Sequence, residues 1–130
     1  MPTYDDRFFN PPAPVARVTL RNPEKGETLS DVPMLIDSGA DVTLIPQGSI
    51  ALLGVNVDPD ASYEVMGFDG SKSFAQVVNL DLVFLERVFR GRFLVINQEW
   101  GILGRDVLNH VSVLLDGPRL IWDEQKPTGK

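Results

Sequence analysis

The residues whose types and spacing could do chemistry lie in the first third of the chain, in the stretch Leu35-Ile36-Asp37-Ser38-Gly39-Ala40-Asp41. An apolar run brings an acid, Asp37, to the end of a predicted strand, and Gly39 permits the sharp turn that follows. Residues 42–45 run apolar again until Pro46 stops them. The acid therefore lies in a tight loop between two predicted buried segments, where a charge needs a reason.

Two interpretations of this loop compete. Asp, Ser and Gly are common turn formers, so the tripeptide alone is compatible with an ordinary surface turn. Alternatively, Asp37 is half of a catalytic carboxylate pair, in which two acids share one proton and activate a water molecule. The rest of the chain has to decide between these interpretations.

Composition limits the other classes of function. A chain of 130 residues with 43% hydrophobic content fits one domain with a modest core. The net charge of −6 argues against a nucleic-acid partner, because phosphate binding needs a basic face. The absence of cysteine excludes disulfides and thiolate metal sites, and no metal or cofactor constellation is present. Because neither a membrane span nor a signal peptide is evident, we expect a cytoplasmic protein without a membrane partner.

The elements that must position the acid are mostly strands. Alternating apolar residues and turn signals predict strands at 15–20, 29–36, 63–66, 73–78, 80–84, 92–96, 102–103, 111–115 and 120–122. Residues 47–53 form a helical turn or a loop, and residues 105–110 a brief helix. The domain spans 15–123, preceded by a flexible, proline-rich arm at 1–14 and followed by a flexible tail at 124–130. Phe8-Phe9 in the arm is an apolar pair and a candidate for self-cleavage.

A second motif, Ile102-Leu103-Gly104-Arg105-Asp106-Val107-Leu108, follows a predicted hairpin with a glycine-bearing tip. Together with the Asp37 loop, in this order, it resembles the retropepsins, the retroviral-type aspartic proteases. The resemblance covers roughly residues 15–122 and favours the catalytic interpretation of Asp37. It implies a mostly β acid-protease fold, a small closed β-barrel with a flap hairpin and one short C-terminal helix, acting as a homodimer on peptide or protein substrates.

The resemblance also implies roles for particular residues. Asp37 would be the catalytic acid, with Ser38 and Gly39 completing its loop. Asp41 and Arg105 would form a buried charged pair that locks this loop to the short helix, next to Gly104. The positions that would bind substrate are Ala40, Asp41 and Ile102 in the cleft and Gly67, Phe68, Asp69, Gly70 and Ser71 in the flap.

One property follows from counting the acids. The chain contains a single Asp-Ser-Gly, whereas the mechanism needs two carboxylates, one ionised and one protonated. A two-fold dimer would place two copies of Asp37 side by side. The flap departs from the family pattern, because a carboxylate at Asp69 would disfavour closure over the acids at neutral pH. The alternative to an endopeptidase is a non-catalytic module of the same fold that binds peptides or assembles with a partner.

Overall fold

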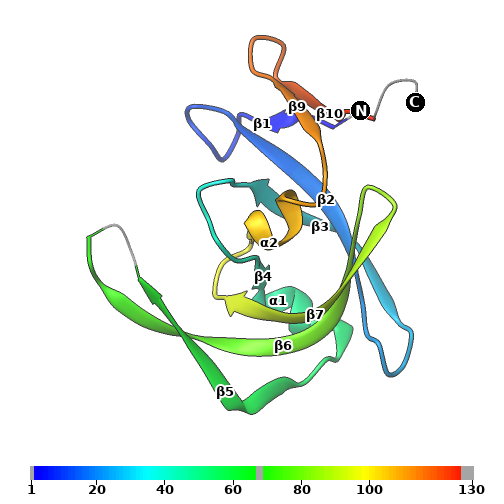
Figure 1. Ribbon diagram of the computed structural model, residues 1–130, viewed down its shortest axis with the longest axis vertical. Coiled ribbons are helices and arrows are strands. Elements are labelled where there is room, and N and C mark those ends of the chain that lie inside the picture. The colour runs from blue at the N-terminus through cyan, green and yellow to red at the C-terminus, as the bar shows by residue number, and fades with distance from the viewer. Residues whose placement is uncertain (1, 67–68, 127–130) are drawn as a thin grey trace.

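The computed structural model describes residues 2–66 and 69–126 (Figure 1). The elements follow in the order β1 (Tyr4–Asp5), β2 (Ala13–Arg21), β3 (Thr28–Ile36), β4 (Leu44–Pro46), α1 (Gln47–Leu53), β5 (Val57–Met66), β6 (Lys72–Phe84), β7 (Arg87–Ile96), β8 (Gly101–Leu103), α2 (Arg105–Leu108), β9 (Val113–Asp116) and β10 (Ile121–Glu124). The mostly β prediction is confirmed, and α2 is the expected short C-terminal helix. Residues 47–53 form a second helix.

Eight strands form one sheet in the order β1-β2-β3-β8-β4-β7-β6-β5. An additional antiparallel pairing joins β6 to β2, so that β6 pairs with β7 on one edge and with β5 and then β2 on the other. Strand β8 lies parallel to β3, with Leu35 opposite Ile102 and Ile36 opposite Leu103. Because the two strands run the same way, the residues that follow them meet at one edge of the sheet. The closed barrel stays a prediction.

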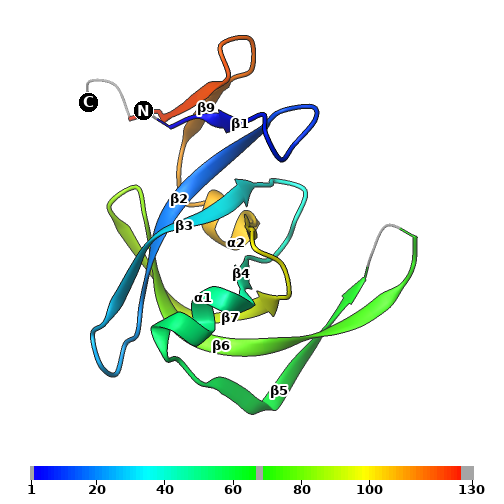
Figure 2. The ribbon, with the colours of Figure 1, turned by 180° about the vertical axis from the view of Figure 1, so that it is seen from behind.

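The core lies on one side of the strands that lead to this edge. Met34 and Leu103 are fully buried, whereas their neighbours Leu35 and Ile102 are only half-buried. This alternation is typical of strands with one face in the core. Helix α1 covers part of the core through Ile50 and Leu53 and packs near β3 and β4, as the view from behind shows (Figure 2).

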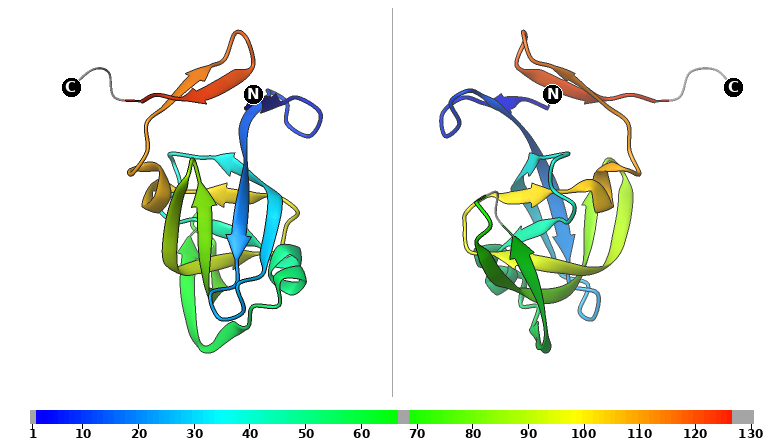
Figure 3. Two further views of the ribbon diagram at one scale, coloured as in Figure 1. Left: turned by 90° about the vertical axis from the view of Figure 1, so that its right-hand side faces the viewer. Right: turned by 60° about the vertical axis from the view of Figure 1, so that its left-hand side comes forward.

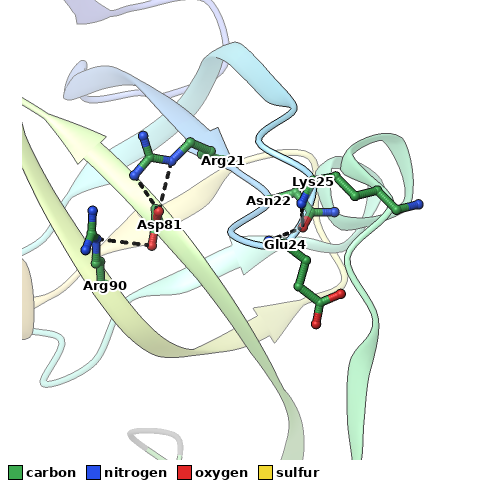
Figure 4. A network of polar contacts seen from close by, with 6 residues as sticks. All are labelled: Arg21, Asn22, Glu24, Lys25, Asp81 and Arg90. Carbon is green, nitrogen blue, oxygen red and sulfur yellow. Dashed lines mark hydrogen bonds and ion pairs between the residues drawn. The ribbon is translucent and has the colours of Figure 1, made fainter.

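A buried charge in the sheet is balanced by arginine. Asp81 on β6 is 5% exposed, and its Oδ2 accepts hydrogen bonds from Nε and NH2 of Arg21 at 2.9 and 2.6 Å (Figure 4). Arg90 on β7 lies 3.9 Å from the other carboxylate oxygen. The pair therefore ties β2 to β6 at the point where the two strands meet.

The hairpin of β5 and β6 extends well beyond the body of the sheet (Figure 1). Strand β6 is one continuous element, although the sequence predicted two strands at 73–78 and 80–84. Strand β7 begins at Arg87 and includes Gly91, so it starts five residues earlier than the predicted 92–96. Gly67 and Phe68, at the expected flap tip, lie outside the described residues.

Two segments of the predicted N-terminal arm, Tyr4–Asp5 and Ala13–Pro14, pair in the sheet, while the flexibility of residues 1–14 stays a prediction. Tyr4 pairs with Pro14 in the sheet, and its N–H donates to the carbonyl oxygen of Leu120 at 2.9 Å. Strand β1 thereby lies beside the hairpin of β9 and β10, as Figure 3 shows. Local composition suggested an extended arm, but pairing with the distant β10 supplies partners for its backbone. The predicted tail begins inside β10, and its residues 127–130 lie outside the described part.

Candidate active site

Asp37 follows β3 directly and is held by its own loop. Its backbone N–H donates to the carbonyl oxygen of Leu103 at 3.1 Å, which continues the pairing of β3 with β8. The N–H of Gly39 donates to Oδ1 of Asp37 at 2.9 Å, and the N–H of Ala40 donates to the Asp37 carbonyl oxygen at 3.2 Å. The half-buried carboxylate is therefore oriented by the turn, while its Oδ2 accepts no hydrogen bond from the described residues.

The second motif packs directly on this loop. The N–H of Arg105 donates to the carbonyl oxygen of Ala40 at 2.9 Å. A Cβ on Gly104 would lie 2.4 Å from the carbonyl oxygen of Val42, so only glycine fits without movement of backbone. The structure therefore brings together the two motifs that the sequence paired.

The expected ion pair between Asp41 and Arg105 is not formed in the single chain. Both side chains are exposed, and NH1 of Arg105 donates instead to the carbonyl oxygen of Ser38 at 2.8 Å. The four ion pairs among the described residues include neither Asp41 nor Arg105. Arg105 still links α2 to the Asp37 loop, but it does so through a backbone carbonyl rather than through a carboxylate.

The sequence analysis missed a polar network beneath the loop. Thr43 is fully buried, and its hydroxyl donates to Oδ1 of Asp106 at 2.6 Å while accepting from the N–H of Gly104 at 3.0 Å. The N–H of Thr43 donates to Oδ2 of the same acid at 3.1 Å. A signal for it was present, because a threonine within the apolar run 42–45 must find hydrogen-bond partners when buried.

Of the expected flap residues, the structure describes 69–71. Asp69 is exposed, and its Oδ1 accepts a hydrogen bond from the N–H of Ser71 at 2.9 Å. Hydrogen bonds from Ser71 hold the pKa of the Asp69 carboxyl below its usual range. No hydrogen bond or ion pair joins Asp69, Gly70 or Ser71 to the Asp37 loop in the part of the chain that is described.

The hairpin of β5 and β6 shares a cavity with the polar network. This cavity, of about 150 Å³, is lined by Tyr63 on β5, by Val42 and Thr43 after the Asp37 loop, and by Asp106 on α2. Ile102, the remaining predicted cleft residue, pairs with both Leu35 and Leu44. The described residues contain no group of three or more His, Cys, Asp or Glu side chains arranged to hold a metal ion. They also contain no helix that is long and apolar enough to cross a membrane.

These features define a class of protein. In a mostly β fold, one aspartate lies in a tight loop after β3, and this loop is hydrogen-bonded to the Gly104-Arg105 turn that follows the parallel strand β8. Comparison with known proteins supports this class. The family model of retroviral aspartyl proteases matches residues 12–116. The chain therefore belongs to the retroviral aspartyl protease family, and the resemblance found in the sequence is confirmed.

A solved structure shows the same fold. EIAV protease, solved in complex with the inhibitor HBY-793, matches with a TM-score of 0.57 and 19% sequence identity, over 82% of this chain and 91% of that chain. No curated protein matches the chain. The segments 2–11 and 117–126 lie outside the family match, and they contain β1 and β10.

Proposed function

We propose that this chain is an aspartic endopeptidase of the retropepsin type, with a catalytic dyad formed by one Asp37 from each subunit of a homodimer. The observation that carries the proposal is the geometry of the Asp37 loop. Asp37 is half-buried as a residue, its carboxylate is oriented through Oδ1 by the Gly39 N–H, and the N–H of Arg105 donates to the Ala40 carbonyl oxygen of the same loop. A rigidly held acid is what general acid-base catalysis requires.

The chemistry needs two such acids. Two carboxylates in contact do not both ionise readily, so they share one proton. The ionised member would accept a proton from the attacking water, while the protonated member would donate a hydrogen bond to the carbonyl oxygen of the scissile peptide. We therefore expect peptide hydrolysis without a metal or a cofactor, and activity that is favoured at acidic pH.

A second copy has a surface to occupy next to the loop. A groove of about 450 Å³ runs from Ser38 past Leu108 on α2 to Val113 and Leu115 on β9. Leu114 and Leu115 are 51% and 49% exposed, and β10 is the only strand that pairs with β9 among the described residues. An unpaired strand edge with exposed leucines favours association. Because the groove includes Ser38, a copy seated there would lie beside the Asp37 loop.

Substrate would bind as an extended strand under the hairpin of β5 and β6, the proposed flap. Main-chain hydrogen bonds to the hairpin would give affinity, and side-chain pockets would give preference. Ala40, Asp41 and Ile102 would line this cleft, and residues 67–71 would close over it.

The decisive experiment removes the acid and keeps its shape. We expect Asp37→Asn to abolish cleavage of a mixed peptide library while the circular dichroism spectrum and the dimer are retained. Glu24→Gln, which removes an exposed carboxylate from the turn between β2 and β3, is the control and should cleave as the parent does. Cleavage by Asp37→Asn at the parent rate would reject the dyad. Peptide binding by the parent without any cleavage would favour a binding module.

Mixing the two chains tests whether the site is shared. If parent and Asp37→Asn chains exchange freely, pairs with two acids form as the square of the parent fraction. Activity should then fall faster than that fraction, and it should also fall on dilution below the dimer dissociation constant. A linear decline, with exchange confirmed by tagged subunits, would mean that each chain works alone.

A further inference from the structure

The proposed catalytic acid, Asp37, lies on the same face of the sheet as the half-buried side chains of Leu35 and Ile102. Side chains two residues apart on a strand point to the same face, and register partners on neighbouring strands lie side by side. Asp37 thus follows the face of Leu35, whose partner on β8 is Ile102. The opposite face carries the fully buried Met34 and Leu103. The face with Asp37 therefore looks away from the core.

Trp100 lies on the Asp37 face as well. It lies in the bend just before β8, and a contact across the sheet places it. Arg17 is the register partner of Pro33, two residues before Leu35, and its guanidinium carbon lies 6.0 Å from the centre of the Trp100 ring. Trp100 and Arg17 thus mark the end of this face away from Asp37.

The N-terminal loop packs on that end. The rings of Phe8 and Phe9 lie 5.6 and 5.2 Å from the Trp100 ring, the second edge-on at 82°. Oδ1 of Asp5 accepts hydrogen bonds from the N–H groups of Arg7 and Phe8 at 2.9 and 2.8 Å, which folds the loop back. Phe8 nevertheless remains 67% exposed, so its ring presents an open apolar surface.

We propose that the N-terminal loop is one wall of the peptide cleft, where Phe8 and Trp100 form an aromatic subsite with Arg17 at its rim. The subsite would take a large apolar or aromatic side chain of the substrate, because such a side chain can bury itself against both rings. Phe9, which is half-buried, positions Trp100 from behind. This assignment rests on the proposed function, since it makes the loop part of the same peptide site.

The test compares Phe8→Ala with the full-length parent. A peptide library read by mass spectrometry gives the preference at each substrate position. We expect kcat/KM for peptides with a large apolar residue at one flanking position to fall about tenfold, while peptides with alanine there change by less than about twofold. Phe8→Tyr should retain the preference. Leu52→Ala, which removes a similarly exposed apolar side chain from α1, is the matched control and should leave it unchanged.

Two further measurements separate the possible failures. The emission of Trp100 is the difference between the spectrum of a chain and that of the same chain with Trp100→Phe. This emission should lie at longer wavelength in Phe9→Ala than in the parent if the loop packs on Trp100 in solution. Peptide binding is measured in the Asp37→Asn background with and without Phe8→Ala. Equal binding by both chains, or an unchanged substrate preference, overturns the subsite alone. Absence of peptide binding by either chain overturns the proposed function together with the subsite.

Discussion

The hydroxyl of Thr43 donates a 2.6 Å hydrogen bond to the carboxylate of Asp106, a residue 63 positions further along the chain. The same hydroxyl accepts from the N–H of Gly104, so one buried side chain joins the segment after the Asp37 loop to two residues of the second motif. This arrangement ties the segment after the acidic loop to the start of the short helix.

Replacing Thr43 with valine should lower the free energy of unfolding by about 1–3 kcal/mol. The substitution keeps the volume but leaves the buried N–H of Gly104 without a partner and removes one hydrogen bond from Asp106. Denaturant unfolding followed by fluorescence measures the change. Thr28→Val, at an exposed position where β3 begins, should be close to neutral. Equal stability of the two variants would show that the network contributes nothing.

Gly104→Ala should destabilise the fold by about 1–3 kcal/mol or more and should impair activity. The new methyl group would meet the carbonyl oxygen of Val42 at 2.4 Å, so the backbone next to the Asp37 loop would have to move. Gly117→Ala in the turn before β10 adds the same methyl group with no atom within 4 Å and serves as the control. A parent-like melting temperature and activity in Gly104→Ala would contradict the close packing of the two motifs.

Asp69→Asn should extend peptide cleavage towards neutral pH. Hydrogen bonds from Ser71 depress the pKa of Asp69, so its negative charge persists as pH falls through the usual range for aspartate and is lost only below it. If the hairpin closes over the proposed dyad, this charge opposes closure wherever it is present. The ratio of variant to parent activity should therefore exceed one at pH 5–7 and approach one only in stronger acid.

Profiles of kcat/KM against pH measure this ratio. Asp60→Asn, an exposed acid at the other end of β5, controls for the general loss of one negative charge. Superimposable profiles of parent and Asp69→Asn would show that the hairpin charge has no part in closure.

Arg21→Ala should cost about 1.5–3 kcal/mol of stability, because it leaves the buried carboxylate of Asp81 without its two short hydrogen bonds. Arg90→Ala removes the other arginine from the same carboxylate. Since Arg90 is 74% exposed on its side chain and 3.9 Å away, its loss should cost less than about 1 kcal/mol. Chemical denaturation of both variants measures the two losses in the free energy of unfolding. Equal losses would contradict the unequal roles of the two arginines.

Much of the site could be predicted from short stretches of sequence. An apolar run that ends in Asp37, with Gly39 two residues later, predicts an acid in a tight turn, and Gly104 predicts close packing of backbone. Alternating apolar residues and turn-forming residues within short segments likewise indicated most of the strands. Their boundaries were less accurate, as the early start of β7 and the continuous β6 show, because pairing with neighbouring strands extends a strand beyond its own signals.

The sequence by itself determined the mostly β fold class and the family and singled out Asp37 as the candidate acid, because these depend on motifs and periodicities within a few residues. Only the tertiary structure decided which side chains meet across the chain. Arg105 bonds to the Ser38 carbonyl oxygen instead of pairing with Asp41, and Thr43 reaches Asp106. Phe9 packs on Trp100 far along the chain. Such contacts depend on the register of β3 with β8 and on the pairing of β1, which local sequence patterns do not specify.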